Sequence, residues 1–285
     1  MTSLRNRHLV DTNWLADRLE APDLIVVDGS LHLPTAGRNA RDEYDQAHIP
    51  GALFFDIEAI SDHSNPLPHM LPSSVQFASS MKKMGIGDGT RVVVYDTVGL
   101  YSAARVWWML RIMGHQDVAV LDGGLKKWRA EGRPVTDEPT PPRQPAHFTP
   151  RFNGGLVRDL DDMKLAITKG LEQVLDARSP GRFKGQEKEP RPGLRPGHMP
   201  GAINVPYGTL IREDGTLKSE PELRAAFHAA GVDLSRPTVT SCGSGVTAGI
   251  LTLALAILGR GDVAVYDGSW VEWGHEAAGT DVVTG

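Results

Sequence analysis

Two segments of this sequence are nearly the same: Asp117-Val118-Ala119-Val120-Leu121-Asp122-Gly123-Gly124 and Asp262-Val263-Ala264-Val265-Tyr266-Asp267-Gly268-Ser269. Each is a short apolar run that ends in an aspartate and small residues, and each is followed by a tryptophan, Trp128 or Trp273. Nearly all-apolar runs of this length are typical of strands that are covered on both faces. We therefore predict that each segment contains a buried strand of a mostly parallel sheet.

The surrounding sequence repeats in the same order. Leu24-Ile25-Val26-Val27-Asp28 matches Gln173-Val174-Leu175-Asp176, and His48-Ile49-Pro50-Gly51-Ala52 matches His198-Met199-Pro200-Gly201-Ala202. A repeat of this length indicates a duplicated domain and not a solenoid of short units. Strand-like runs alternate with helix-like segments such as residues 247–258, so the sequence predicts an α/β fold. We expect two tandem domains, each a mostly parallel sheet flanked by helices.

A proline-rich segment separates the two copies. Six prolines fall between residues 134 and 150. This density excludes a helix or a central strand and favours an extended, stiff connector. We expect the first domain over residues 1–138, a linker over residues 139–152 and the second domain over residues 153–285.

Composition and charge restrict the classes of function. The 285 residues are 40% hydrophobic and 23% charged, as in soluble globular proteins, and a net charge of −5 argues against nucleic-acid binding. The longest apolar stretch, about residues 246–258, is too short to cross a bilayer, and residues 1–8 lack the apolar core of a signal peptide. A single cysteine excludes an intramolecular disulfide and fits a reducing compartment. We expect a cytoplasmic monomer without nucleic-acid or membrane partners.

The single cysteine lies on a glycine-rich turn between a strand-like run and an apolar helix-like segment: Ser241-Cys242-Gly243-Ser244-Gly245-Val246-Thr247-Ala248. Backbone N–H groups on such a turn, together with the positive end of the following helix, favour a thiolate. The turn also follows the carboxyl end of a strand, where ligands bind in parallel α/β folds. We interpret Cys242 as a nucleophile, although a lone cysteine is more often inert. The first copy has Asp96 at this place, so its domain is expected to act as a scaffold.

Together these features resemble the rhodanese superfamily and, within it, the two-domain 3-mercaptopyruvate sulfurtransferases. The resemblance covers nearly the whole chain. Its motifs are Cys242-Gly243-Ser244-Gly245-Val246-Thr247-Ala248, Asp176-Ala177-Arg178-Ser179, Gly181-Arg182-Phe183, Glu189-Pro190-Arg191, both His-x-Pro-Gly-Ala segments, Phe54-Phe55-Asp56-Ile57, Pro68-His69-Met70-Leu71-Pro72 and Trp107-Trp108-Met109. It implies a transferase that takes sulfur from 3-mercaptopyruvate as a Cys242 persulfide and releases pyruvate. The sulfur then passes to cyanide or a thiol, such as a thioredoxin-type dithiol, with no metal or organic cofactor.

The resemblance also implies roles for individual residues. Arg182 and Arg191 match the family's substrate arginines, whose guanidinium groups suit a planar carboxylate. Ser244, His69 and Glu58 match a proton relay beside Cys242, with Glu58 where some members have aspartate. The loop residues expected around the substrate are Gly243, Gly245, Val246 and Thr247. Structural roles are expected for Arg178, Arg195, His48 and His198.

Other functions remain open. Thiosulfate sulfurtransferases resemble one another in carrying cationic residues after the cysteine, which suits a dianionic donor, whereas Gly243 and Ser244 are small and neutral. Thiosulfate sulfurtransferase activity is therefore the first alternative, and a persulfide carrier without turnover is the second. A cysteine phosphatase would place an arginine after five intervening residues, where this sequence has Ala248.

Overall fold

The computed structural model describes residues 4–285; residues 1–3, which begin the first predicted domain, lie outside it. The chain divides into two compact units. Unit 1 holds the described part of Met1–His63, together with Leu71–Asn153 and Arg212–Leu217. Unit 2 holds Ser64–Met70, Gly154–Ile211 and Lys218–Gly285. Each unit therefore includes one short segment whose neighbours along the chain belong to the other unit.

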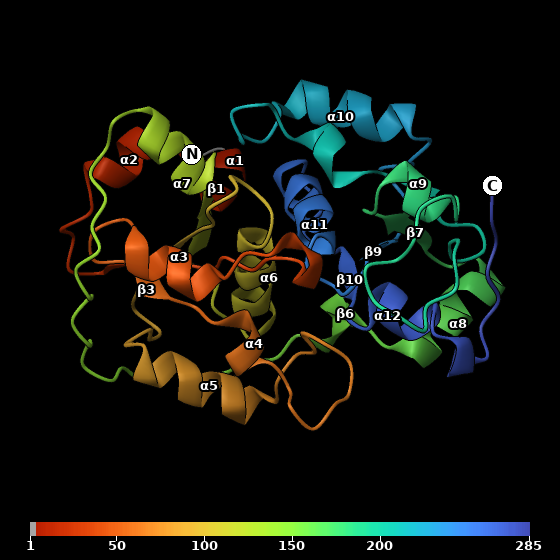
Figure 1. Cartoon of the computed structure of the whole chain (residues 1–285), viewed down its shortest axis with the longest axis horizontal. Coiled ribbons are helices and arrows are strands. Elements are labelled where there is room, and N and C mark those ends of the chain that lie inside the picture. The colour runs from red at the N-terminus through yellow and green to blue at the C-terminus, as the bar shows by residue number, and fades with distance from the viewer. Residues whose placement is uncertain (1–3) are drawn as a thin grey trace. The chain divides into compact units, whose positions relative to one another are not determined.

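Unit 1 is built on a five-stranded parallel sheet with the strand order β1-β5-β4-β2-β3. Figure 1 labels β1 and β3 of this sheet. Its strands are β1 (Leu9–Val10), β2 (Leu24–Asp28), β3 (Leu53–Phe54), β4 (Arg91–Tyr95) and β5 (Val118–Leu121). Its helices are α1 (Leu4–His8), α2 (Thr12–Ala16), the 3-10 helix η1 (Pro34–Ala36), α3 (Ala40–Gln46), α4 (Ile57–Ile60), α5 (Ser74–Lys83), α6 (Ala103–Ile112) and α7 (Gly124–Ala130).

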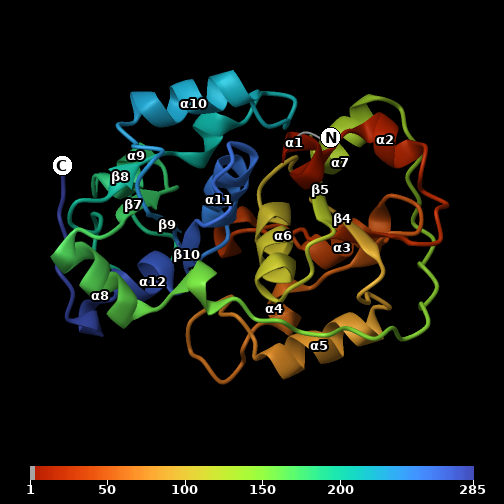
Figure 2. The same ribbon diagram turned by 180° about the vertical axis from the view of Figure 1, so that it is seen from behind.

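Helices cover both faces of this sheet because its strands are apolar on both sides. Alternate residues of β4 point to opposite faces. Val93 and Tyr95 share a buried cluster with Leu125 and Trp128 of α7. Helix α6 packs on β4 and β5, beside which it lies in Figure 2. A Cβ on Gly29 would meet the side chains of both Val106 and Val94, so α6 covers the face opposite to α7.

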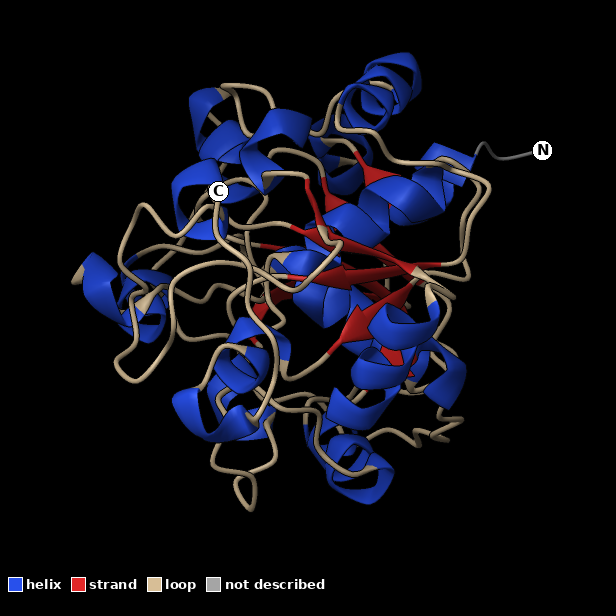
Figure 3. Ribbon diagram, turned by 90° about the vertical axis from the view of Figure 1, so that its right-hand side faces the viewer, coloured by secondary structure: helices blue, strands red, loops and turns tan. Residues whose placement is uncertain are grey.

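Unit 2 repeats this topology, with a parallel sheet of order β6-β10-β9-β7-β8. Its strands are β6 (Val157–Arg158), β7 (Gln173–Asp176), β8 (Ile203–Asn204), β9 (Thr238–Ser241) and β10 (Ala264–Tyr266). Its helices are η2 (Gly154–Leu156), α8 (Leu160–Lys169), α9 (Pro180–Phe183), η3 (Tyr207–Leu210), α10 (Glu220–Ala229), α11 (Ala248–Ile257), α12 (Ser269–Trp273) and η4 (Glu276–Ala278). Helices flank the strands of both sheets (Figure 3), which confirms the predicted fold class.

The strand that leads to the cysteine is held in the middle of the unit 2 sheet. β9 pairs with β10 on one side and with β7 on the other, and all of its residues are buried. α11 packs on β9 and β10, and every residue of that helix is buried as well. The carboxyl end of β9 is therefore a rigid base for the loop that follows it.

Among the described helices, none has the length and apolar character needed to cross a membrane.

Candidate active site

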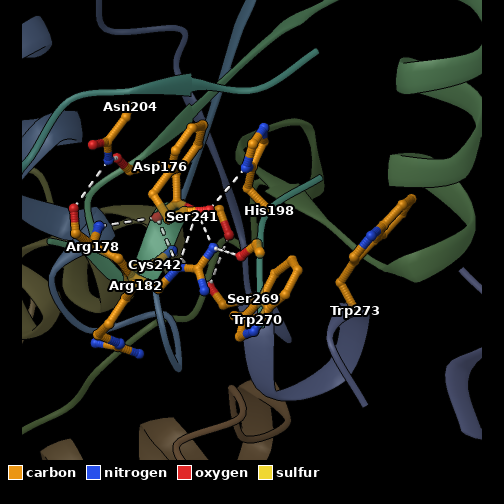
Figure 4. A network of polar contacts seen from close by, with 12 residues as sticks. Asp176, Arg178, Arg182, His198, Asn204, Ser241, Cys242, Ser269, Trp270 and Trp273 are labelled. Carbon is orange, nitrogen blue, oxygen red and sulfur yellow. Dashed lines mark hydrogen bonds and ion pairs between the residues drawn. The ribbon is translucent and has the colours of Figure 1, made fainter. Parts of the chain in front are cut away.

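Cys242 follows directly on β9 and begins the loop into α11. The residue is 2% exposed, and its sulfur forms no disulfide. Its backbone N–H donates to Ser269 Oγ at 3.2 Å, and its carbonyl accepts from the Trp270 N–H at 3.1 Å (Figure 4). The first residues of α12 therefore hold the cysteine backbone through both of its polar groups.

Ser269 is a site residue that the motif analysis missed. Its φ of 49° lies in the left-handed region, which is uncommon for residues other than glycine. Its hydroxyl donates to the Tyr266 carbonyl at 2.9 Å while it accepts from the Cys242 N–H. The available signal was the repeat itself, because Ser269 aligns with Gly124, a glycine with a φ of 54°. A serine at a position shaped for glycine indicates a use for the side chain.

The loop between Cys242 and α11 leaves backbone donors open. Gly245 has a φ of 76°, a conformation that glycine adopts without strain. No side chain caps α11. Within residues 4–285, the backbone N–H groups of Ser244, Thr247 and Ala248 donate to no other group. Open N–H groups at the start of a helix favour an anion there.

Arg178 is buried beside this loop in a set of charged contacts. Its Nη2 lies 2.6 Å from Asp176 Oδ2, and its Nη1 lies 2.8 Å from Glu189 Oε1. Its guanidinium carbon lies 4.1 Å from the centre of the Trp270 ring. Burial alone would lower the pKa of Arg178, but the two carboxylates outweigh burial and raise it. Arg178 therefore stays charged and fixes the loop after β7 against α12 (Figure 4).

Arg182 lies against Gly243, the residue that follows Cys242 in this loop. It belongs to α9, which begins where the Ser179 hydroxyl accepts the Arg182 N–H at 3.3 Å. Its Nη2 lies 2.5 Å from Glu189 Oε2. A Cβ added to Gly243 would approach that same Nη2 to 2.9 Å, so only glycine at 243 leaves room for this placement. The structure thus brings Arg182 to the loop that carries Cys242.

His69 and Arg191 are joined within unit 2. Arg191 Nη2 lies 3.1 Å from His69 Nε2. Because arginine only donates hydrogen bonds, Nε2 is the acceptor, and the proton of neutral His69 is then on Nδ1. His69 is 5% exposed and has a φ of 62°. Non-glycine residues in this conformation are held by their surroundings and are concentrated at functional sites.

The other predicted site residues fall in two groups. The loop residues Ser244, Val246 and Thr247 are buried next to Cys242 in sequence. Glu58 is exposed on α4 in unit 1. The relay of Ser244, His69 and Glu58 stays a prediction.

The residues expected to be structural make local contacts. His48 Nδ1 contacts the Tyr44 carbonyl at 2.7 Å, and His198 Nδ1 contacts the Phe183 carbonyl at 2.8 Å. Each imidazole also stacks on the ring of that aromatic residue. Arg195 donates to the Trp273 and Thr280 carbonyls at 2.9 and 2.7 Å. Over residues 4–285, no group of three or more His, Cys, Asp or Glu side chains is arranged to hold a metal ion.

The chain is similar to known proteins over most of its length. A family model described as a rhodanese-like domain matches the chain twice, over residues 11–131 and 159–276. The 3-mercaptopyruvate sulfurtransferase of Homo sapiens is 44% identical over 284 residues, which cover 98% of this chain and 95% of the relative. The thiosulfate sulfurtransferase of Bos taurus is also 44% identical, over 278 residues that cover 95% and 93%. The crystal structure of SseA from Escherichia coli, described as a 3-mercaptopyruvate sulfotransferase, superposes with a TM-score of 0.85 at 41% identity. That alignment covers 94% of this chain and 99% of the SseA chain.

Proposed function

The chain belongs to the rhodanese family, and from that premise we propose that it is a sulfurtransferase acting on 3-mercaptopyruvate. Sulfur passes through a persulfide on Cys242 to a thiol or to cyanide, and pyruvate is released. The observation that carries the proposal is the loop after β9, where a buried cysteine, open backbone donors and Arg182 come together.

The first half-reaction loads the enzyme. The Cys242 thiolate attacks the sulfur of 3-mercaptopyruvate, a sulfur–sulfur bond forms, and the carbon–sulfur bond breaks. Its electron pair stays on the substrate as the enolate of pyruvate, which takes up a proton at carbon. Arg182 and Arg191 bind the carboxylate and the keto oxygen, and the hydrogen bonds that they donate stabilise the enolate. The open N–H groups of Ser244, Thr247 and Ala248 stabilise the sulfur left on Cys242.

The second half-reaction unloads the enzyme. A thiolate or cyanide attacks the outer sulfur, and Cys242 leaves as a thiolate. The products are an acceptor persulfide or thiocyanate, so donor and acceptor react in separate steps with ping-pong kinetics. In the cell, the acceptor that we propose is a small thiol or a thioredoxin-type dithiol.

The enolate takes its proton from the proposed relay or from solvent. Ser244, His69 and Glu58 form the proposed relay, yet His69 Nε2 contacts Arg191. Transfer from Ser244 to His69 through Nε2 therefore requires that this nitrogen exchange one partner for the other. A proton from solvent is the alternative route.

Thiosulfate sulfurtransferase activity is the second candidate, since a relative with each name is 44% identical to this chain. Gly243 and Ser244 favour the keto acid because they bring no positive charge to the loop. The test compares initial rates of thiocyanate formation from 3-mercaptopyruvate and from thiosulfate, with cyanide as acceptor. We expect a strong preference for 3-mercaptopyruvate, with one pyruvate released for each thiocyanate formed. We expect no turnover by Cys242→Ser.

Two other outcomes would replace the proposal. A preference for thiosulfate would identify the protein as a thiosulfate sulfurtransferase. A stable persulfide without turnover of either donor would identify a sulfur carrier. Light scattering of the purified chain tests the expected monomer, which a dimer mass would contradict.

A further inference from the structure

Glu189 lies between the two arginines of the site. Its side chain is 3% exposed, with Oε1 2.8 Å from Arg178 Nη1 and Oε2 2.5 Å from Arg182 Nη2. Arg182 Nε also donates to Oε2, at 3.2 Å. Among the described residues, Arg182 Nη1 forms no hydrogen bond. Glu189 thus occupies one edge of the guanidinium and leaves one nitrogen for a ligand.

These contacts make Arg182 part of a neutral group. Asp176 and Glu189 are the two carboxylates, Arg178 and Arg182 are the two guanidinium ions, and adjacent members are 2.5 to 2.8 Å apart. As a unit the four side chains carry no net charge. Arg182 therefore contributes directed hydrogen bonding to the site but little net positive potential.

We infer that Glu189 is a specificity-determining residue that cancels the charge of Arg182 and so matches the site to a donor with one negative charge. This inference rests on the proposed sulfur-transfer function. Coulomb energy scales with the product of the charges, so cancelling one positive charge weakens attraction for a dianion twice as much as for a monoanion. 3-Mercaptopyruvate with a neutral thiol carries one negative charge, and thiosulfate carries two. Glu189 therefore acts in the same direction as the neutral loop residues Gly243 and Ser244.

Gly243 and Glu189 are also linked by geometry. The nitrogen that Glu189 holds, Arg182 Nη2, is the atom that a Cβ at position 243 would approach to 2.9 Å. The absence of a side chain at 243 permits the ion pair to lie against the loop, and the ion pair sets which nitrogen of Arg182 remains open. Charge cancellation is thus part of how this loop is packed.

The test is the Glu189→Gln variant, which keeps an oxygen acceptor for Arg178 and removes one negative charge. The measured quantity is the ratio of kcat/KM for thiosulfate to kcat/KM for 3-mercaptopyruvate, from thiocyanate formation at low ionic strength. We expect the ratio to rise about tenfold, and the rise to shrink as salt screens the added charge. An unchanged ratio, with both donors slowed equally, would overturn the inference and leave Glu189 a structural residue.

Two variants separate charge from position and from folding. Glu187→Gln makes the same charge change on the same loop, but Glu187 is exposed and contacts the Ser179 hydroxyl. Its ratio should stay at the wild-type value, and an equal rise would overturn the inference by showing a general charge effect. Glu189→Asp keeps the charge on a shorter side chain, so we expect reduced thermal stability with a ratio near wild type. A tenfold rise in Glu189→Asp would assign the effect to displacement of Arg182 and would contradict the inference.

Equilibrium binding supplies a readout that does not depend on turnover. Isothermal titration with pyruvate and with sulfate measures how the site ranks a monoanion and a dianion. Glu189→Gln should raise the affinity for sulfate more than that for pyruvate, and an equal change in both would overturn the inference. If wild-type protein turned over neither sulfur donor, the proposed function would fail while this ranking still decided the role of Glu189.

Discussion

The loop after β4 in unit 1 and the loop after β9 in unit 2 have the same place in the same topology. They differ in the side chain at the start of the loop. In unit 1 the loop surrounds the buried carboxylate of Asp96. Five backbone N–H groups donate to it at 2.7 to 3.0 Å, from Val98, Gly99, Tyr101, Ser102 and Ala103. In unit 2 the corresponding start of the loop is Cys242. At three of the matching positions, Ser244, Thr247 and Ala248, the N–H groups donate to no group in the described part of the chain. The comparison shows that this loop is built to hold an anion, which one copy supplies from its own chain.

The anchors of the two loops are alike. The Asp96 carbonyl accepts the Leu125 N–H at 3.0 Å, as the Cys242 carbonyl accepts the Trp270 N–H at 3.1 Å. A Cβ on Gly124 would lie 2.5 Å from the Asp96 carbonyl, whereas unit 2 places Ser269 at that position. The backbone frame is therefore shared, and the copies differ in the side chains placed on it.

The largest expected effect comes from giving unit 2 the unit 1 residue. Cys242→Asp should abolish sulfur transfer, by at least about a thousandfold, because the nucleophile is gone. It should nevertheless fold at least as stably as Cys242→Ala, since its carboxylate meets the open N–H groups. Thiocyanate assays and thermal melts of both variants measure the two effects. If Cys242→Asp is much less stable than Cys242→Ala, the two loops do not share an anion-binding form.

The reverse deletion tests the filled loop. Asp96→Ala leaves five backbone donors without their acceptor and should lower the free energy of unfolding by more than about 3 kcal/mol. Urea denaturation measures the loss. Asp96→Asn keeps one oxygen acceptor and serves as the control, with a smaller loss expected. Near-wild-type stability of Asp96→Ala would show that water replaces the carboxylate at little cost.

A third difference lies at the ends of β2 and β7. Asp176 is paired with Arg178, whereas the matching Asp28 is followed at that place by Ser30, whose N–H it accepts at 2.9 Å. Burial raises the pKa of Asp28 from 3.8 to about 6, against the lowering effect of Ser30. Because the pKa of Asp28 is raised on folding, the folded protein binds this proton more tightly than the unfolded chain does. Protonation of Asp28 therefore stabilises the fold at low pH, and that contribution is lost as the pH rises through about 6.

Asp28→Asn should therefore gain stability over wild type as the pH increases. The gain should grow by about 1 kcal/mol between pH 5 and pH 8, because the variant has no carboxyl to ionise. Chemical denaturation at both pH values measures it. Asp23→Asn, an exposed carboxyl at the start of the same strand, provides the comparison. A difference that is constant with pH would show that Asp28 is not the titrating group.

The smallest effect concerns the anchor that only unit 2 has. Ser269→Gly adopts the Gly124 pattern, relieves the positive φ and removes the acceptor of the Cys242 N–H. These changes oppose each other, so stability should change by less than about 1 kcal/mol. Activity should fall several-fold because Cys242 is less firmly held. Ser269→Thr, which keeps the hydroxyl, should retain more activity. Equal losses in both variants would show that the hydrogen bond from the Cys242 N–H to the residue 269 hydroxyl does not contribute to activity.

Sequence reasoning predicted what depends on local order and internal repetition. The apolar strands, the duplication and the glycine-rich turn after β9 are all visible in consecutive residues, and the structure confirms the fold class that they predict. Ser269 and Glu189 depend instead on contacts between segments far apart in the sequence or on opposite sides of a loop. The placement of Ser64–Met70 in unit 2 and the His69–Arg191 contact are likewise set by tertiary packing. Motif matching could name His69 and Arg191, but it could not show that they touch.

The filled loop around Asp96 has a consequence for how the other loop rests between reactions. A pocket of amide donors that is complete in one copy and open in the other favours whichever covalent state of Cys242 best fills it. The charged terminal sulfur of a persulfide is such a group, whereas the bare thiolate is smaller. We therefore expect the persulfide of Cys242 to be the resting state of the enzyme between reactions, and the free thiolate to be the form that it occupies least.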